Sequence, residues 1–214
     1  MKRSIGILLV ALWLAPTAAA QQVVDRIVAR IGDGVITESQ IAELGRFQQL
    51  VDGKQQSAAQ RMHELAEQWI VNHEASLSGF QAPSARDVQR AFARLEKRFG
   101  SAAAFEKRLK RAGLTDSEAR QLLDREIFLS RYLDYKFRPE VQVDEREIED
   151  YYRKTLAPEL RKAGHSVPPI ESVADQVRNV LIERGISERA GRWLDQMRQR
   201  WRVEPVESAS NSPE

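Results

Sequence analysis

A nearly unbroken succession of helical segments between Thr37 and Arg200 is the feature that most constrains how this chain can fold. Apolar residues recur every three or four positions within each segment, and glycines such as Gly53, Gly79 and Gly113 separate the segments. No run of alternating apolar and polar residues interrupts this pattern. The sequence therefore predicts a mainly α-helical body.

Capping boxes mark several of the helix starts. A Ser or Thr at the N-cap is followed three residues later by Gln or Glu, so that each side chain can accept a hydrogen bond from the other's backbone amide. These pairs are Thr37 with Gln40, Ser57 with Gln60 and Thr115 with Glu118. The expected helices cover about 37–50, 57–77, 84–99, 101–112, 115–137, 145–160 and 170–200, the last with a candidate break at Gly185.

Only the two ends of this region read as extended chain. Val23–Ile31 is rich in β-branched residues, Gly32–Gly34 supplies a tight turn, and Val35–Ile36 reads as a short return strand. A two-stranded hairpin is marginally stable alone in water, so it needs a further partner. The other extended segment is Trp201–Val206. We expect it to pair with the hairpin and close the helical body into one domain.

Three motifs, in this order, resemble the N-terminal chaperone region of SurA-like periplasmic folding factors. The first is the hairpin sequence IGDGVIT at 31–37. The second is Phe105–Leu109 followed by Gly113–Glu118, and the third is Val141–Asp144 followed by Glu147–Tyr152. The resemblance implies a multi-helix chaperone region over 21–160. It also implies a linker, a C-terminal helix and a strand over 161–206 that complete the same domain.

The chain departs from the fuller members of that family after the Tyr-Tyr motif. Those members carry one or two parvulin-type prolyl isomerase domains there, whereas this chain has only 157–169. Pro158, Gly164, Pro168 and Pro169 predict a loop in this segment. Thirteen residues cannot form an isomerase domain, and His165 has no second catalytic group nearby in the sequence.

The first twenty residues have the organisation of a signal peptide. Lys2 and Arg3 precede the apolar run Ile5–Leu14, and Ala18–Ala20 ends the segment with small residues. We expect cleavage after Ala20 and a periplasmic protein without stable membrane insertion; a retained N-terminal anchor is the alternative. The polar tail 207–214 is expected to be disordered.

The charge balance argues against nucleic acid as a partner. Removing Lys2 and Arg3 from 33 basic residues leaves 31, which equals the number of acidic residues. Basic and acidic side chains also alternate along helical segments, which is typical of solvated helix faces. The chain has no cysteine, and therefore no disulfide or thiol chemistry.

No pattern of catalytic residues stands out. His63 and His73 are ten positions apart and belong to no HExxH motif, and the chain has no nucleophile elbow, Walker loop or dinucleotide-binding glycine motif. We therefore predict no catalytic residue, no metal site and no cofactor. These expectations favour a binding protein over an enzyme.

The aromatic and apolar residues of the central helices are the candidate client-binding residues. Each can also simply fill the core, because a stripe at helical spacing usually does. The candidates are Met62, Trp69, Phe92, Leu95, Phe99, Phe105, Leu109 and Tyr132.

The function expected from these features is that of an ATP-independent periplasmic chaperone, a holdase, whose partners are unfolded, extended or outer-membrane client polypeptides. Two alternatives remain open: a non-catalytic envelope adaptor and a periplasmic prolyl isomerase. The sequence leaves the oligomeric state open.

Overall fold

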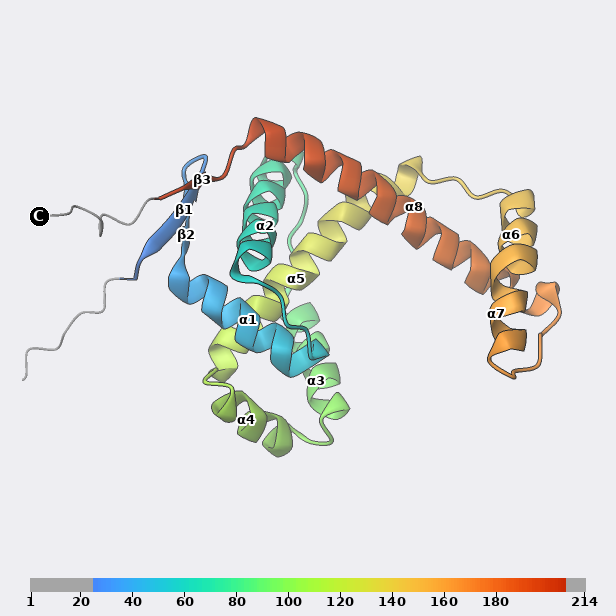
Figure 1. Ribbon diagram of the computed structural model, residues 1–214, viewed down its shortest axis with the longest axis horizontal. Helices are drawn as coiled ribbons and strands as arrows, with labels where there is room; N and C mark the ends of the chain where they lie inside the picture. The colour runs from blue at the N-terminus through green and yellow to red at the C-terminus, as the bar shows by residue number, and fades with distance from the viewer. Residues whose placement is uncertain (1–24, 207–214) are drawn as a thin grey trace, which may run out of the picture.

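The computed structural model describes residues 25–206 as a helical body with a small sheet at one end and a helical arm at the other (Figure 1). The elements in order are β1 (Ile27–Ile31), β2 (Gly34–Thr37), α1 (Glu38–Asp52), α2 (Ala58–Ser78), α3 (Ala85–Arg98), α4 (Ala102–Arg111), α5 (Asp116–Phe137), the 3₁₀ turn η1 (Arg138–Glu140), α6 (Glu145–Tyr151), the π-helical turn η2 (Tyr152–Leu156), α7 (Ala157–Lys162), α8 (Ile170–Arg200) and β3 (Glu204–Pro205). The predicted fold class, mainly helical with a small β element, is confirmed.

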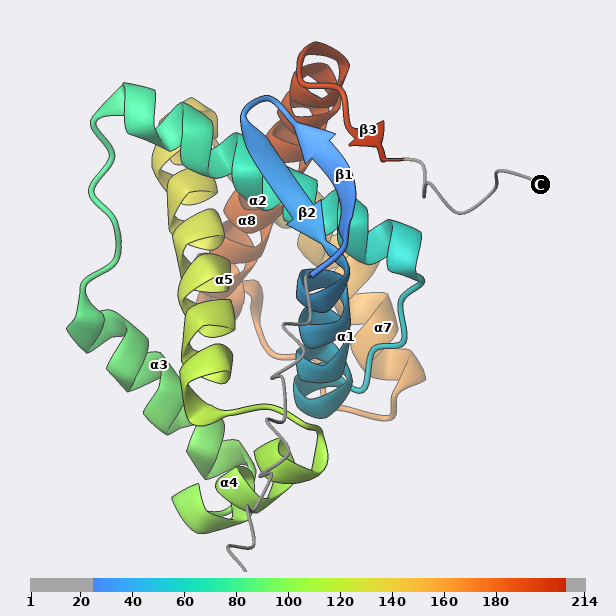
Figure 2. The same cartoon turned by 90° about the vertical axis from the view of Figure 1, so that its left-hand side faces the viewer.

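The sheet joins the two ends of the described chain. Its order is β2-β1-β3, and both pairings are antiparallel. Ala29 lies opposite Pro205, and the Val206 amide donates to the Val28 carbonyl at 2.9 Å. Figure 2 shows the hairpin in front of α2, with β3 on the far side of β1. The predicted closure of the domain by its two ends is confirmed, with a third strand shorter than 201–206.

The helix starts follow the predicted caps. Full capping boxes form at Thr37, Ser57 and Thr115, and the N3 side chains bond back to the cap amides. Each box satisfies backbone donors that the first turn of a helix leaves free. Local sequence therefore determines where α1, α2 and α5 begin.

One core fills the space between the sheet and the first five helices. It contains Ile31 and Ile36 from the hairpin, Ile70 and Val71 from α2, and Leu194 from α8. Trp69 lies over the hairpin turn: a Cβ added at Gly34 would be 2.3 Å from its Nε1 atom, and one at Gly32 would be 2.4 Å from its Cη2 atom. Glycine at both turn positions therefore allows the indole to lie directly on the hairpin.

The arm is built on the long helix α8, with α6 and α7 at its outer end (Figure 1). Ile148 of α6, Ala157 of α7 and Val177 of α8 are buried there. The predicted break at Gly185 is wrong, because α8 runs without interruption. A Cβ at Gly185 would lie 2.8 Å from Cγ1 of Val141, so this glycine permits the close approach of the chain before α6.

The predicted loop over 157–169 is only partly correct. Helical structure continues through η2 and α7 to Lys162, and the connection to α8 is shorter than expected. Pro158 lies in the first turn of α7, where a missing backbone amide costs least. Pro158 is therefore part of a helix rather than of the predicted loop, and helical structure extends two residues beyond the expected end near residue 160.

The predicted signal peptide 1–20 and the predicted tail 207–214 lie outside the described residues. Among residues 25–206, no helix combines the length and the apolar character needed to cross a membrane.

Candidate functional site

The structure places most of the predicted client-binding residues inside the core. Phe92, Leu95, Phe105, Leu109 and Tyr132 are each at most 5% exposed. Met62, Trp69 and Phe99 are half-buried and pack against the same core. In this conformation the five buried side chains are covered by neighbouring residues, so a surface for another polypeptide would have to be built from other residues.

Phe80, in the connection after α2, lies among the aromatic side chains of α5. Its ring centroid is 5.4 Å from those of Phe128 and Tyr132 and 5.3 Å from that of Tyr135. Tyr132 is buried beneath this group, and burial raises the pKa of its hydroxyl. Tyr135, one helical turn further along α5, is 53% exposed. The cluster therefore runs from the core to the surface.

A groove opens beside this cluster, where α8 crosses the C-terminal half of α5. We call it the α5–α8 groove; its volume is about 740 Å³. Its lining residues are Phe80, Gln81, Ser130, Arg131, Leu133, Asp134, Tyr135, Arg138, Glu183, Ile186, Ser187 and Ala190. Ile186 and Ala190 belong to a second small core with Phe137, so the floor is continuous with packed side chains.

Ion pairs hold the rim of the groove in place. Arg138, which directly follows α5, contacts Asp134 of α5 at 2.6 Å and Glu183 of α8 at 2.7 Å. The hydrogen bonds to Asp134 and Glu183 raise the pKa of Arg138, so its charge is fixed at all physiological pH values. Arg138 thus links the two helices that form the walls.

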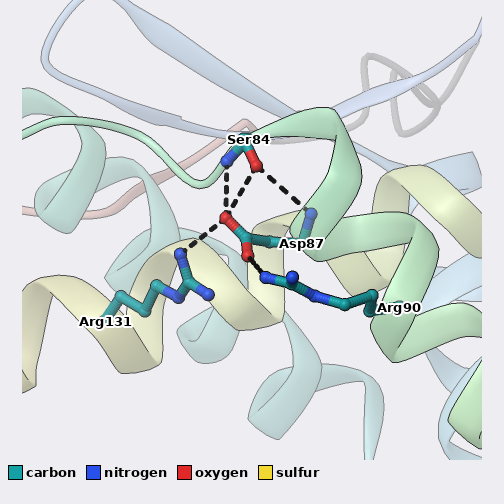
Figure 3. A network of polar contacts seen from close by, with 4 residues as sticks. All are labelled: Ser84, Asp87, Arg90 and Arg131. Atoms are coloured by element: carbon teal, nitrogen blue, oxygen red, sulfur yellow. Dashed lines mark hydrogen bonds and ion pairs between the residues drawn. The ribbon is translucent and has the colours of Figure 1, made fainter.

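A second polar network positions Arg131 on the same rim (Figure 3). Its Nη1 atom donates to Asp87 Oδ2 at 3.0 Å. Asp87 also accepts from the Ser84 amide at 3.0 Å and from Arg90, and its side chain is only 14% exposed. The network therefore joins the N-terminus of α3 to α5.

Asp87 is expected to stabilise the fold most strongly near neutral pH. Hydrogen bonds from Arg131, Ser84 and Arg90 lower the pKa of this carboxyl well below its ordinary value of 3.8. A lowered pKa in the folded state contributes stability above the ordinary pKa, and this contribution is lost as the pH falls through the folded-state value. Asp87→Asn should lower the melting temperature at pH 7, and the difference from the unmodified protein should shrink progressively below about pH 4.

Thermal melts of both proteins between pH 7 and pH 3 measure this effect. Arg90→Gln is the control, because Arg90 is a more exposed partner of Asp87 and lies within α3 itself. A difference that stays constant down to pH 3 would contradict the stabilising role of the ionised carboxylate.

A second cavity, of about 250 Å³, collects carboxylates on one side of α1. Asp52, Glu64, Glu67 and Glu126 are among its lining residues, together with Lys54. Burial raises the pKa of Glu67, and Arg198 at 2.9 Å partly offsets this shift. Between residues 25 and 206, however, no group of His, Asp and Glu has an arrangement that could hold a metal ion.

The histidines are placed apart from one another. His73 stacks on Trp69 at a centroid distance of 5.1 Å and meets the Trp201 ring at 4.7 Å. His63 is exposed on α2, and His165 is exposed in the connection before α8. His73 thus has a packing role, in the aromatic group that attaches the C-terminal segment to the body.

Sequence reasoning missed the groove because two of its walls come from distant segments. It gave Ile186 and Ala190 to a helical stripe, and it counted Phe80 and Tyr135 among many aromatics. Only the crossing of α5 and α8 brings these surfaces together.

The sequence matches no protein-family model and no curated protein at the level that would identify a relative. The likeness to SurA-like proteins therefore rests on the hairpin and junction motifs alone.

Proposed function

We propose that this protein is an ATP-independent chaperone of the periplasm, which holds apolar segments of unfolded polypeptides without a catalytic step. The observation that carries the proposal is the α5–α8 groove, in which an apolar floor lies inside a charged rim. A concave site with apolar side chains and a few polar groups around them is the common form of a binding site.

The floor suits side chains of an extended polypeptide. Phe80 and Tyr135 present aromatic surface, while Leu133, Ile186 and Ala190 provide aliphatic surface. A groove of this volume lies in the range of sites that enclose one small ligand, so it would take a few client residues at a time. Burying so little surface gives weak binding, which suits release by mass action alone.

The rim supports the same function. Arg131, Asp134, Arg138 and Glu183 carry charges of both signs and stay close to solvent. Hydrated charges of mixed sign keep an apolar floor accessible and oppose self-association. They also offer hydrogen-bond donors and acceptors to a client backbone, which makes binding independent of the client's detailed sequence.

Tyr135 is the residue that separates client binding from folding. Because it is 53% exposed, Tyr135→Ala should change the free energy of unfolding by no more than about 1 kcal/mol. Removing an aromatic ring from the groove should weaken client binding by about tenfold, which corresponds to 1.4 kcal/mol. Suppression of aggregation of an unfolded outer-membrane protein, followed by light scattering, measures the loss.

Val180→Ala is the matched control, since Val180 is 45% exposed on α8 and lies outside the groove. If both variants suppress aggregation as well as the unmodified protein does, the groove is not the client-binding site. No suppression by the unmodified protein, together with one stoichiometric partner in a pull-down, would favour the envelope adaptor instead. Catalysed cis–trans isomerisation of a short Xaa-Pro peptide would favour the prolyl isomerase alternative.

A further inference from the structure

Four arginines from three helices line a single open cleft, which shares no lining residue with the α5–α8 groove. The cleft has a volume of about 750 Å³ and lies between α1, α2 and α4. Arg46 comes from α1, Arg61 from α2, and Arg108 and Arg111 from α4. The remaining lining residues are uncharged, so no carboxylate of the described chain lines the cleft.

The charges of these arginines are poorly compensated within the protein. None of the four forms an ion pair with another described residue. Arg46 lowers the pKa of Glu118, but the hydrogen bonds that this carboxylate accepts from Thr115 lower it more. Like charges gathered in one cleft repel each other, and an anion would remove that repulsion.

Two of the guanidinium groups also have unused donors. The Nε atoms of Arg46 and Arg61 are buried and have no hydrogen-bond partner among the described residues. Arg61 is held through Nη1, which donates to the Gln56 carbonyl. A buried donor without a partner lowers stability, so the two guanidinium groups are held beside the cleft at a cost that an anion bound to their other donors would offset.

Gly45 leaves space on α1 for the side chain of Arg61. A Cβ at this position would lie 2.9 Å from both Cζ and Nε of Arg61, too close for an ordinary contact. Glycine in the interior of a helix lowers stability relative to alanine. The close packing of the Arg61 guanidinium against α1 is a reason for glycine at this position. The lack of a side chain at Gly45 thus lets the positively charged guanidinium of Arg61 lie close to α1 beside the cleft.

We propose that this cleft binds a ligand through a phosphate group. Guanidinium groups match phosphate and carboxylate equally well as flat, two-donor partners. A phosphate monoester, however, has three terminal oxygens in a tetrahedral arrangement and close to two negative charges, whereas a carboxylate has two coplanar oxygens and one charge. Donors arriving from three helices, with four positive charges, fit the first better. This site is independent of the chaperone groove.

The phosphate group can belong to a soluble compound or to a lipid headgroup, and two probes separate these sources. The full exported chain is titrated calorimetrically with inorganic phosphate, and it is sedimented with phosphatidylcholine vesicles that contain phosphatidic acid. Saturable binding of inorganic phosphate that also displaces the protein from vesicles indicates a soluble ligand. Sedimentation with vesicles that inorganic phosphate does not reverse indicates a lipid headgroup. Both outcomes support the site.

Matched double variants test the location. Arg61→Gln with Arg108→Gln should weaken binding of the phosphate probe at least tenfold. Arg146→Gln with Arg192→Gln removes the same charge from exposed positions on α6 and α8 and should leave binding within twofold. Circular dichroism checks that both keep their helices. Gly45→Ala, which displaces Arg61 without removing a charge, should weaken binding while the protein stays folded.

Three results would overturn the proposal. One is the absence of binding to either probe. Another is an equal loss of binding in both double variants, which would mean attraction by overall charge. The third is tighter binding of a polyglutamate peptide than of either phosphate probe, which would assign the cleft to acidic polypeptides.

Discussion

Phe92→Ala is expected to lower the free energy of unfolding by about 3–5 kcal/mol, the usual loss when a buried phenylalanine is truncated. Phe92 is 1% exposed, meets the Phe105 ring edge-on at 5.5 Å, and has the Arg120 guanidinium 3.7 Å above its own ring. Domains of this size are typically stable by about 5–15 kcal/mol, so the variant would lose a large share of its stability. Urea unfolding followed by tryptophan fluorescence gives the value.

Phe99→Ala is the matched comparison. Phe99 is half-buried at the end of α3, 5.0 Å from the same Phe105 ring, and we expect roughly half the loss because less apolar surface is removed from the core. Both residues are candidates for client contact on sequence alone. A Phe92→Ala protein that is as stable as the unmodified one but binds clients weakly would place Phe92 on the surface and contradict its buried position.

Deleting residues 201–214 is expected to destabilise the hairpin at the opposite end of the chain. The deletion removes β3, the hydrogen bond from Val206 to Val28, and the Trp201 ring, whose centroid is 5.2 Å from that of Trp69. Loss of the indole alone should cost about 3 kcal/mol or more, given the usual cost of truncating a packed tryptophan. Hydrogen exchange of the β1 amides, from Ile27 to Ile31, should become faster by several orders of magnitude.

Two further variants divide this effect. Deleting only 207–214 keeps the whole sheet of the described chain and should leave exchange in β1 unchanged. Trp201→Ala keeps the strand and removes the ring, so it measures the aromatic contribution separately. Unchanged exchange after the longer deletion would show that β3 does not protect β1.

Helix boundaries were predictable because their determinants are local. Thr37 and Gln40 are three residues apart, and the two hydrogen bonds between them need no other part of the protein. The role of Pro158, in contrast, was not predictable. The effect of a proline depends on whether it falls in the first turn of a helix, which the sequence alone does not specify.

The division between core and surface was not predictable from spacing. Phe92 and Tyr135 both lie on helices rich in apolar residues, but α5 and α4 cover the first, whereas the second faces the groove. The arginine cleft was missed for a related reason. Arg46, Arg61 and Arg108 are far apart in the sequence, and only the meeting of α1, α2 and α4 brings them together.

The central position of β1 in the sheet has a consequence for the order in which the protein folds. β1 can pair with its neighbour in sequence, β2, at an early stage, but its other edge stays open until β3 is in place. Joining segments so far apart in the chain carries a loop-closure cost that the intervening helices reduce once they are packed. The helical body is therefore expected to form first, and the sheet to close last. A folding intermediate without β3 would expose one edge of β1 to other extended chains until that step is complete.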